Sequence, residues 1–225
     1  MARLARQAAG FTLIELLVTI SIMALMTLLS WRGIDGMMRT KDQLSARSDQ
    51  VLTLQTALTQ WTVDLDNLAE TRTVSAVDYD GSVLRITRRD AVSPAEGLRV
   101  VAWTRRFADG NAFWVRWQSP NVRTQSDLLA AWAKAQQWGR EPTPEDRALD
   151  IPLAVLTDWQ LFYYRDNAWS NPLSSAADPN RPVASGLNAP PKGVRLVLAL
   201  APGQPFAGVL TRDWVRPLVG GGKSL

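Results

Sequence analysis

Hydrophobic residues occupy most positions between residues 11 and 31 of this 225-residue chain. The one charged side chain in that run is Glu15, and a short basic leader containing Arg3 and Arg6 precedes it. About 20 consecutive apolar residues are enough for a helix to cross the hydrocarbon core of a bilayer. Arginines next to a span stay on the cytoplasmic side. The pattern therefore predicts one membrane-spanning helix, with the rest of the chain on the far side of the membrane.

Beyond the apolar run the pattern changes to a helix with a single apolar face, over about residues 40–68. Its apolar positions follow one another at intervals of three, four and seven residues, which keeps them on one side of a helix. We expect this side to pack on the strands that follow rather than to form a coiled coil. The polar residues are expected on the more solvent-exposed faces of the helix. The apolar positions are Leu44, Val51, Leu54, Leu58, Trp61, Leu65 and Leu68, and the polar ones are Arg47, Asp49, Gln55, Gln60 and Asp64.

Two glycines, Gly33 and Gly36, lie between the apolar run and this second helical segment. Glycine weakens a helix, so the pair is compatible with a bend at this point. Small residues also allow a second helix to approach closely. The pattern leaves both interpretations open.

The rest of the chain shows short runs in which apolar and polar residues alternate, a pattern typical of antiparallel strands. One helix interrupts them at Ser126–Trp138, where we expect Ser126 to cap the start and Gly139 to follow the end. Residues 140–151 are predicted to form a loop. The predicted strands are Thr73–Tyr79, Ser82–Arg89, Leu98–Arg106, Ala112–Gln118, Ala154–Arg165, Gly193–Ala201 and Gly208–Pro217.

These elements predict an α+β fold in which one long N-terminal helix packs on antiparallel β-sheet. The glycine-rich end of the chain predicts a disordered tail. The expected organisation is a leader at 1–10, a membrane-spanning half of the helix at 11–31, a second half at 32–68, a globular α+β domain at 69–218 and the tail at 219–225.

Composition excludes several kinds of chemistry. The chain has no cysteine and no histidine, so it lacks thiolate nucleophiles, disulfides and the commonest general base and metal ligand. The net charge of +4 falls to +2 when Arg3 and Arg6 leave with the leader, because each carries one positive charge. A charge this small and scattered gives no reason to expect nucleic acid as a partner.

Glu15 is the residue that most needs an explanation. An ionised side chain in a membrane span is costly and by default marks a functional site with a partner. If a peptidase cuts after Gly10, Phe11 becomes the new N-terminus and its amine is the nearest cation. Glu15 lies four residues further on, so it would pair either with that amine in the same helix or with the Phe11 amine of a neighbouring subunit. Both pairings remove an isolated charge from hydrocarbon.

The residues Gly10-Phe11-Thr12-Leu13-Ile14-Glu15, followed by Leu16-Leu17-Val18, strongly resemble the class III signal of type IV pilins and type II secretion pseudopilins. This resemblance implies a pilin-like fold and cleavage between Gly10 and Phe11 by a prepilin peptidase. It also implies that the same enzyme family N-methylates Phe11, and that Glu15 is the acidic residue used in assembly.

Further segments look like one pseudopilin family, minor pseudopilin J, with the weakest similarity across residues 109–151. The resemblance implies a structural protein with its globular domain in the periplasm and a single pass through the bacterial inner membrane. It further implies a tip complex with minor pseudopilins of the I, K and H types, which primes the major pseudopilin filament for protein export across the outer membrane. The supporting segments are residues 31–36, 54–58, 64–65, 162–164, 167–169 and 193–198.

Two other functional classes remain as alternatives. A minor pilin of a type IV pilus shares the same N-terminal signal. A membrane-tethered periplasmic enzyme or nucleic-acid binder is the less favoured alternative, and the ten tryptophans are its main support, since aromatic side chains stack on bases. However, Trp103, Trp114, Trp117 and Trp159 lie in strand patterns, and Trp132 and Trp138 lie on an apolar helix face, where aromatics fill a core. We therefore expect core packing and no nucleic-acid partner.

The acidic and basic clusters give no strong sign of catalysis. The carboxylates are interpreted as solvated turn residues, and the pairs Arg88-Arg89 and Arg105-Arg106 as solvated strand edges. Asp78-Tyr79-Asp80-Gly81 lacks the remaining ligands of an EF-hand loop. We therefore predict no enzyme, no catalytic residue, no cofactor and no metal site, although calcium binding is not decided by the pattern. The acidic clusters are Asp64, Asp66 and Glu70, then Asp78 and Asp80, then Glu145 and Asp146.

Overall fold

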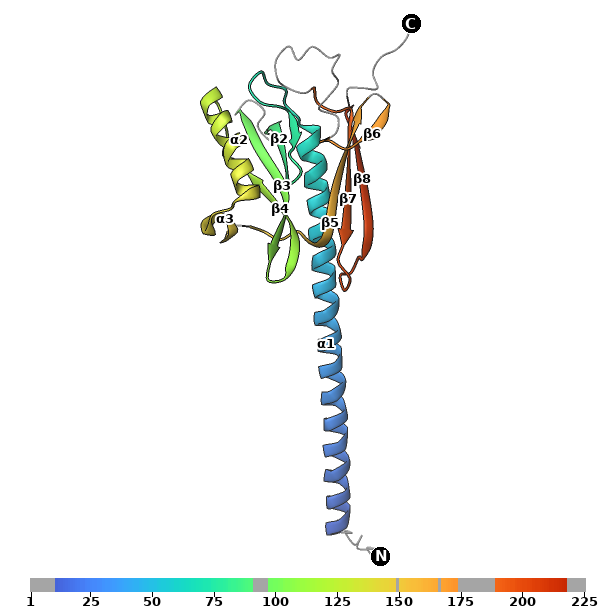
Figure 1. Cartoon of the computed structure of the whole chain (residues 1–225). Coiled ribbons are helices and arrows are strands. Elements are labelled where there is room, and N and C mark those ends of the chain that lie inside the picture. The colour runs from blue at the N-terminus through green and yellow to red at the C-terminus, as the bar shows by residue number, and fades with distance from the viewer. Residues whose placement is uncertain (1–10, 91–96, 149, 166, 174–188, 218–225) are drawn as a thin grey trace, which may run out of the picture. The chain divides into compact units, whose positions relative to one another are not determined.

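The computed structural model describes residues 11–90, 97–148, 150–165, 167–173 and 189–217. Figure 1 shows the order of the elements along the chain. The chain divides into two compact units, residues 1–48 and 49–225. Helix α1, Leu13–Asp66, contributes residues to both units.

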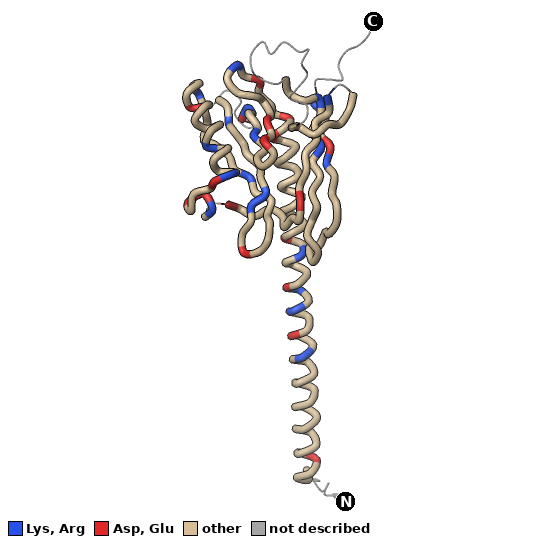
Figure 2. Tube along the Cα trace, viewed as in Figure 1, with Lys and Arg blue, Asp and Glu red and all other residues tan. Residues whose placement is uncertain are grey.

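The described part of the first unit is helical from Leu13 onward, and every residue from 11 to 50 is exposed. The helix continues without a break through Gly33 and Gly36, and a Cβ added at either would meet nothing within 4 Å. The glycines therefore make no close approach to another part of the described chain. Figure 2 shows a long stretch of α1 without charged residues. In the sequence this stretch lies between Glu15 and Arg32.

The second unit is built on an antiparallel sheet of eight strands in the order β1-β2-β3-β4-β5-β7-β8, with β6 pairing to β5. Only three residue pairs join β4 to β5, from Ala112↔Leu156 to Trp114↔Ala154, whereas β3 and β4 share eight. The strands are β1 Val77–Tyr79, β2 Val83–Arg89, β3 Leu98–Ala108, β4 Asn111–Gln118, β5 Ala154–Arg165, β6 Ala168–Ser170, β7 Gly193–Leu200 and β8 Gly208–Val215.

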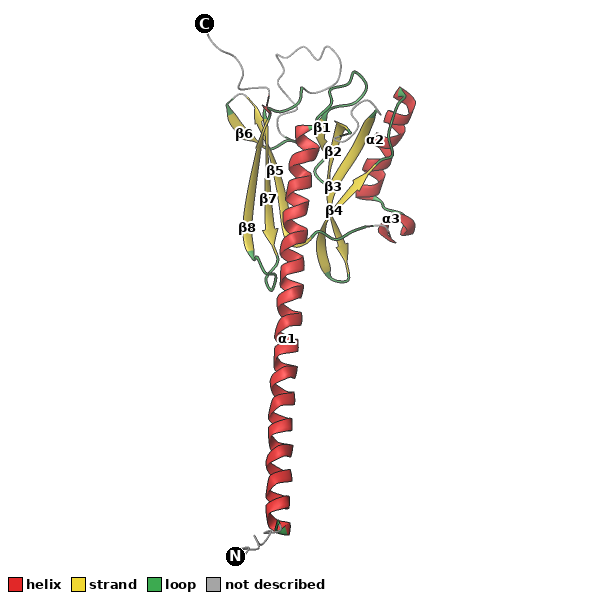
Figure 3. Cartoon of the chain, turned by 180° about the vertical axis from the view of Figure 1, so that it is seen from behind, coloured by secondary structure: helices red, strands yellow, loops and turns green. Residues whose placement is uncertain are grey.

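The last turns of α1 pack on one face of this sheet and form the main core. Figure 3 shows them running between strands β1–β4 on one side and β5–β8 on the other. Trp61 is fully buried, with its ring centroid 5.5 Å from that of Trp103 and 5.9 Å from that of Trp114. The predicted apolar face is thus confirmed from Leu54 onward, while Leu44 is 68% exposed and takes no part in it.

Helix α2, Gln125–Arg140, covers the opposite face of β2–β4. Successive strand residues point to opposite faces, so Leu84 and Ile86 lie in the α1 core while Val83 lies in the α2 core. The α2 core also contains Leu128 and Trp138. The prediction of one long helix on antiparallel strands, with a helical insertion, is confirmed.

Several local expectations were wrong. Thr124, not Ser126, caps α2, because its hydroxyl accepts a hydrogen bond from the Asp127 amide at 3.1 Å. Gly139 lies inside α2, where a Cβ would come within 2.1 Å of the Val83 side chain, so the glycine allows the helix to approach β2. The predicted loop contains a short helix, α3, Pro144–Ala148.

The strands differ from the prediction at β1 and at β6. β1 begins at Val77 rather than Thr73, since Thr71 organises a turn there by accepting hydrogen bonds from the Thr73 and Val74 amides. The short strand β6 was not predicted. The leader 1–10 and the tail predicted at 219–225 lie outside the described residues.

Candidate functional site

The first turn of α1 holds Glu15 in a reciprocal cap with Thr12. The Thr12 amide and hydroxyl each donate a hydrogen bond to Glu15 Oε2 at 2.9 Å. In return, the Glu15 amide donates to Thr12 Oγ1 at 3.4 Å. This is the capping box that a threonine and a glutamate three residues apart form at a helix start. Glu15 is therefore held by its own helix, a contact that the sequence analysis did not consider.

Phe11 lies directly before this cap and is 90% exposed. Gly10, the other residue of the predicted cleavage site, lies outside the described residues. The Phe11 nitrogen is one residue before the Thr12 amide that already contacts the Glu15 carboxylate. An amine created at Phe11 would therefore appear next to a carboxylate that is already positioned. The pairing of Glu15 with that amine stays a prediction.

The helix that follows is apolar on all sides. Among the described residues, one helix, α1, is long and apolar enough to cross a membrane, and its apolar window is not buried by the rest of the protein. A soluble helix of this kind would expose its apolar side chains to water at a large cost. The exposed apolar residues include Leu13, Ile14, Leu17, Ile20, Met23, Met26 and Leu29.

Asp64, at the other end of α1, is fully buried, which contradicts its assignment to a wet face. Its Oδ1 lies 2.8 Å from Arg116 Nη2 and 3.1 Å from Arg88 Nε. Its Oδ2 accepts hydrogen bonds from Arg116 Nε at 2.8 Å and from the indole of Trp103 at 3.0 Å. A buried charge needs such pairing, and all of its partners belong to the sheet or to α1 itself.

The position of Asp64 in the sequence pattern already indicates that its side chain is buried. It lies three residues after Trp61 and four before Leu68, so it falls on the same helix face as the core. A carboxylate on a buried face requires cations nearby. The period of two in β2 and β4 places Arg88 and Arg116 on the face that α1 covers.

The two arginine pairs were expected to be solvated, and for one member of each this is wrong. Arg88 and Arg106 are 6% and 9% exposed. Burial lowers the pKa of Arg88, and the opposite charge of Asp64 counters that effect. Burial likewise lowers the pKa of Arg106, which is countered by its ion pair with Asp150. Both arginines hold helices against the sheet rather than facing solvent.

Asp80 shapes the turn between β1 and β2. Its carboxylate accepts hydrogen bonds from the Ser82 and Val83 amides at 3.0 and 2.8 Å and from Arg140 Nε at 3.0 Å. Burial raises the pKa of Asp80, but these amide hydrogen bonds and the Arg140 charge outweigh it, so the pKa is lowered overall. Gly81 follows at φ +92°, a conformation that favours glycine. The predicted turn is confirmed, and its carboxylate is structural.

The other carboxylates considered for catalysis also have structural partners. Asp66 accepts a hydrogen bond from the Trp214 indole at 2.8 Å, and Glu70 and Asp78 pair with Arg216 and Arg85. At the start of α3, a hydrogen bond from Lys134 and others from Thr143 lower the pKa of Asp146, although burial opposes them. Glu145 shares that short helix and is exposed.

The six tryptophans that were assigned to the core pack there as predicted. Trp103 and Trp114 are fully buried, and Trp138 and Trp159 are 1% and 7% exposed. Trp117 and Trp132 are partly buried and pack against the α2 core. Trp103 and Trp114 lie with ring centroids 4.4 Å apart, inside the sheet–helix core rather than on a surface groove. These residues cannot act as a stacking platform for bases.

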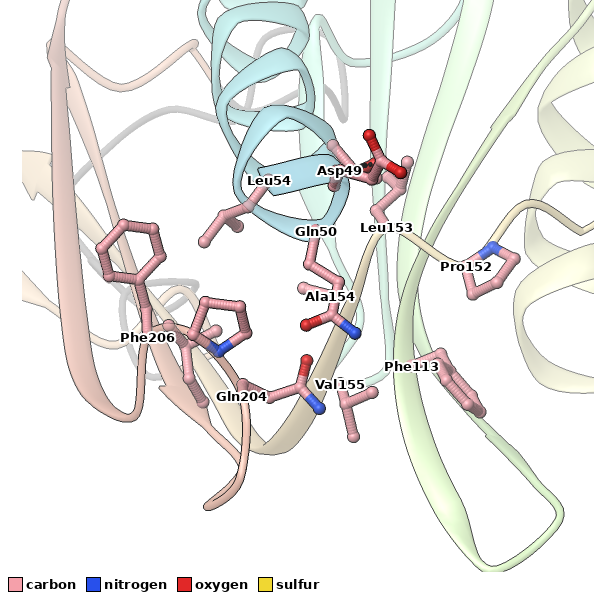
Figure 4. Close-up of a pocket in the computed structure, with 13 residues that line it drawn as sticks. Asp49, Gln50, Leu54, Phe113, Pro152, Leu153, Ala154, Val155, Gln204 and Phe206 are labelled. Atoms are coloured by element: carbon pink, nitrogen blue, oxygen red, sulfur yellow. Dashed lines mark hydrogen bonds between the residues drawn. The ribbon is translucent and has the colours of Figure 1, made fainter. Parts of the chain in front are cut away.

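An apolar cavity of about 250 Å³ lies beside the α1 residues of the second unit (Figure 4). Its walls come from Leu54 of α1, Phe113 of β4, Val155 of β5 and Phe206 of the β7–β8 turn. Asp49 is the one carboxylate in this lining. A single carboxylate without a second acid, base or nucleophile does not make a hydrolytic site. The described residues also contain no group of three acidic side chains placed to hold a metal ion.

Comparison with known proteins finds a match at the N-terminus. Residues 5–31 match the prokaryotic N-terminal methylation motif, which covers the second half of the leader and the apolar run. A search of curated proteins finds no match to the chain. The motif implies processing by a prepilin peptidase. With the long helix on an antiparallel sheet, it makes the chain similar to membrane-anchored, pilin-like proteins, a class that is typically structural.

Proposed function

We propose that this chain is a structural minor pseudopilin of a type II secretion system. The observation that carries the proposal is the N-terminal methylation motif on the exposed, apolar first part of α1, whose first turn contains Glu15. An anchor alone would need no carboxylate there. Among the described residues, the apolar cavity above is lined by one carboxylate and by no second acid, base or nucleophile, which favours a role in assembly over one in catalysis.

The proposed processing follows from the same segment. A prepilin peptidase removes residues 1–10, cutting between Gly10 and Phe11, and the Phe11 amine is then methylated. Residues 11–31 anchor the mature chain in the inner membrane. Residues 32–68 and the globular domain at 69–218 lie in the periplasm, ahead of the tail at 219–225.

The proposed assembly step uses Glu15 as an electrostatic guide. The apolar helix leaves the bilayer only when it enters a bundle of helices that are equally apolar, so its surface stays away from water. Glu15 then neutralises the Phe11 amine of the neighbouring subunit. Thr12 holds the carboxylate ready for this exchange, because it binds the same oxygen in the isolated subunit.

The proposed place of the subunit is the tip complex of the pseudopilus. Minor pseudopilins of the I, K and H types would be its partners, and the major pseudopilin would be added beneath them. The support is the similarity of residues 31–36, 54–58 and 193–198 to minor pseudopilin J. The resulting filament would drive folded proteins across the outer membrane.

A minor pilin of a type IV pilus is the second candidate, because the methylation motif is common to both systems. The decisive experiment is affinity purification of the native protein from cells that express both systems. Recovery of minor pseudopilins, together with loss of protein export in a deletion strain, supports the proposal. Recovery of pilus subunits with normal export refutes it in favour of the pilin.

The processing step has its own test, which both candidates share. Mass spectrometry of the purified native protein is expected to show a chain that begins at Phe11 with one added methyl group. A bulky residue at position 10, as in Gly10→Val, is expected to leave the leader attached. A native chain that begins at Met1 or Ala2 would contradict both candidates.

A further inference from the structure

A second cavity, of about 370 Å³, lies between the β1–β2 turn, the end of β3, the end of α2, and α3. Its lining includes Arg105, Arg106, Arg140 and Arg147, with Trp159 of β5, and contains no carboxylate. We call it the arginine pocket. Figure 2 shows basic and acidic positions side by side around α3 and the neighbouring strands. Four cations lining one cavity repel each other unless anions balance them.

Two of the arginines are anchored in the walls of the pocket. Arg106 pairs with Asp150 and donates a hydrogen bond from Nη2 to the Trp138 carbonyl at 2.9 Å. Arg105 donates from Nη1 to the Thr157 carbonyl at 2.6 Å and lies 3.3 Å from the Asp158 carboxylate. These contacts fix both guanidinium groups and cancel two of the four charges.

The other two arginines lie nearer to solvent. Arg140 pairs through Nε with Asp80 at 3.0 Å, and its side chain is 48% exposed. Arg147 is exposed and, within the described ranges, forms no ion pair. Each guanidinium has five N–H donors, so both have donors that their present contacts do not use. Asp158, Asp150 and Asp80 thus pair with three of the four arginines, and the nearby Asp146 pairs with Lys134, so one positive charge, that of Arg147, is left over.

Aromatic rings lie beside these cations. Phe107 is 71% exposed and lies 5.0 Å from the Arg105 guanidinium, and Trp159 adds a second ring to the lining. Arginine and aromatic residues together are the residues most enriched at energetically important protein–protein contacts. The pocket thus offers both donors for an anion and apolar surface for the chain that carries it.

We propose that the arginine pocket binds a carboxylate presented by an acidic side chain of a partner protein. The excess of one charge fits a monoanion, whereas a phosphate dianion would exceed it. A carboxylate also matches the planar fork of a guanidinium in a bidentate contact. This site involves no residue of α1 and does not depend on the assembly role proposed above.

The test uses the full chain in a neutral detergent and the blocked peptide acetyl-Gly-Glu-Gly-amide, with binding measured by titration calorimetry. The glutamine analogue of the peptide and inorganic phosphate are titrated in parallel. We expect binding of the glutamate peptide that weakens as salt is added, because the contact is partly exposed. We expect at least tenfold weaker binding of the glutamine analogue.

Arg147→Gln is the informative variant, because this exposed residue has no ion pair that the fold needs. It is expected to weaken binding of the glutamate peptide about tenfold. Arg212→Gln is the matched control, since Arg212 is an exposed arginine on β8 without an ion pair in the described structure, and it should leave binding unchanged. Equal binding of the two peptides, an unaffected Arg147→Gln variant, no measurable binding, or tighter binding of phosphate would each overturn the proposal.

Discussion

Helix α1 carries an acidic residue near each end, and the two are satisfied in different ways. Glu15 lies on a part of the helix that is exposed throughout, and its hydrogen bonds come from Thr12 in the same turn. Asp64 is fully buried, and its cations come from β2 and β4. A local cap can be exchanged for another partner at little cost, whereas a buried ion cluster cannot. The first arrangement suits assembly and the second suits a permanent fold.

The strongest test of this comparison is removal of the buried carboxylate. Asp64→Ala leaves Arg88 and Arg116 without their shared anion, so we expect a loss of about 3–5 kcal/mol in the free energy of unfolding. Chemical denaturation of the full chain in detergent, followed by tryptophan fluorescence, measures it.

The matched control for that experiment is Asp35→Ala, which removes an exposed ion pair with Arg39 on the same helix. Its expected cost is about 0.5 kcal/mol or less, because solvent screens exposed pairs. If Asp64→Ala does not fold, Asp64→Asn keeps the size of the side chain and removes the charge. Equal effects at Asp64 and Asp35 would show that the buried cluster is not a determinant of stability.

The exposed carboxylate should behave in the opposite way. Glu15→Leu is expected to leave the unfolding of the globular domain unchanged, and the chain should still insert and be cut. Recruitment of neighbouring subunits should fall at least tenfold in co-purification, because the Phe11 amine loses its partner. Glu15→Gln removes the charge but keeps a side chain that can form hydrogen bonds. It should reduce the recruitment of neighbouring subunits to a similar extent. Normal co-purification and secretion by Glu15→Leu would rule out the pairing.

A smaller effect is expected from the residue that holds Glu15. Thr12→Val removes the hydroxyl of the cap and should cost the helix start about 1 kcal/mol. Amide hydrogen exchange at residues 13–16 of the micelle-bound chain measures this as roughly fivefold faster opening. Unchanged exchange at these amides, with residues 40–44 as the internal reference, would show that the cap is not stabilising.

The smallest expected effect concerns the turn before β2 and depends on pH. The pKa of Asp80 is lowered in the folded chain. Its ionised carboxylate therefore stabilises the fold fully above the pKa of the unfolded chain, and this stabilisation is lost as the pH falls through the pKa of the folded chain. Asp80→Asn should therefore cost about 1 kcal/mol near neutral pH, from weakened amide hydrogen bonds. The difference from the wild type should shrink below about pH 4. Denaturation curves of both proteins at several pH values measure this difference in stability. A difference that stays constant with pH would contradict the proposed role of the Asp80 charge.

Local patterns predicted most of the elements because they depend on neighbouring residues. The strand at Ala154–Arg165 was predicted with the bounds that the structure has, although its register shifts between Leu156 and Asp158. The N-terminal motif was equally recognisable from the sequence, because the basic leader, the signal and the apolar run are adjacent. Helix ends were less predictable. Gly139 was expected to follow the end of the helix, yet α2 continues through it, because β2 lies too close at this point for any side chain.

What the sequence determined by itself is the long N-terminal helix, its membrane-spanning composition and the methylation motif, because each is encoded in consecutive residues. What only the tertiary structure decided is the environment of single charged residues. Asp64 meets Arg116 across 52 positions of the chain, and Arg105 meets Asp158 across 53. Pairings at such separations depend on strand register and helix packing, which a local pattern does not contain. The buried Asp64 cluster and the arginine pocket both arise in this way.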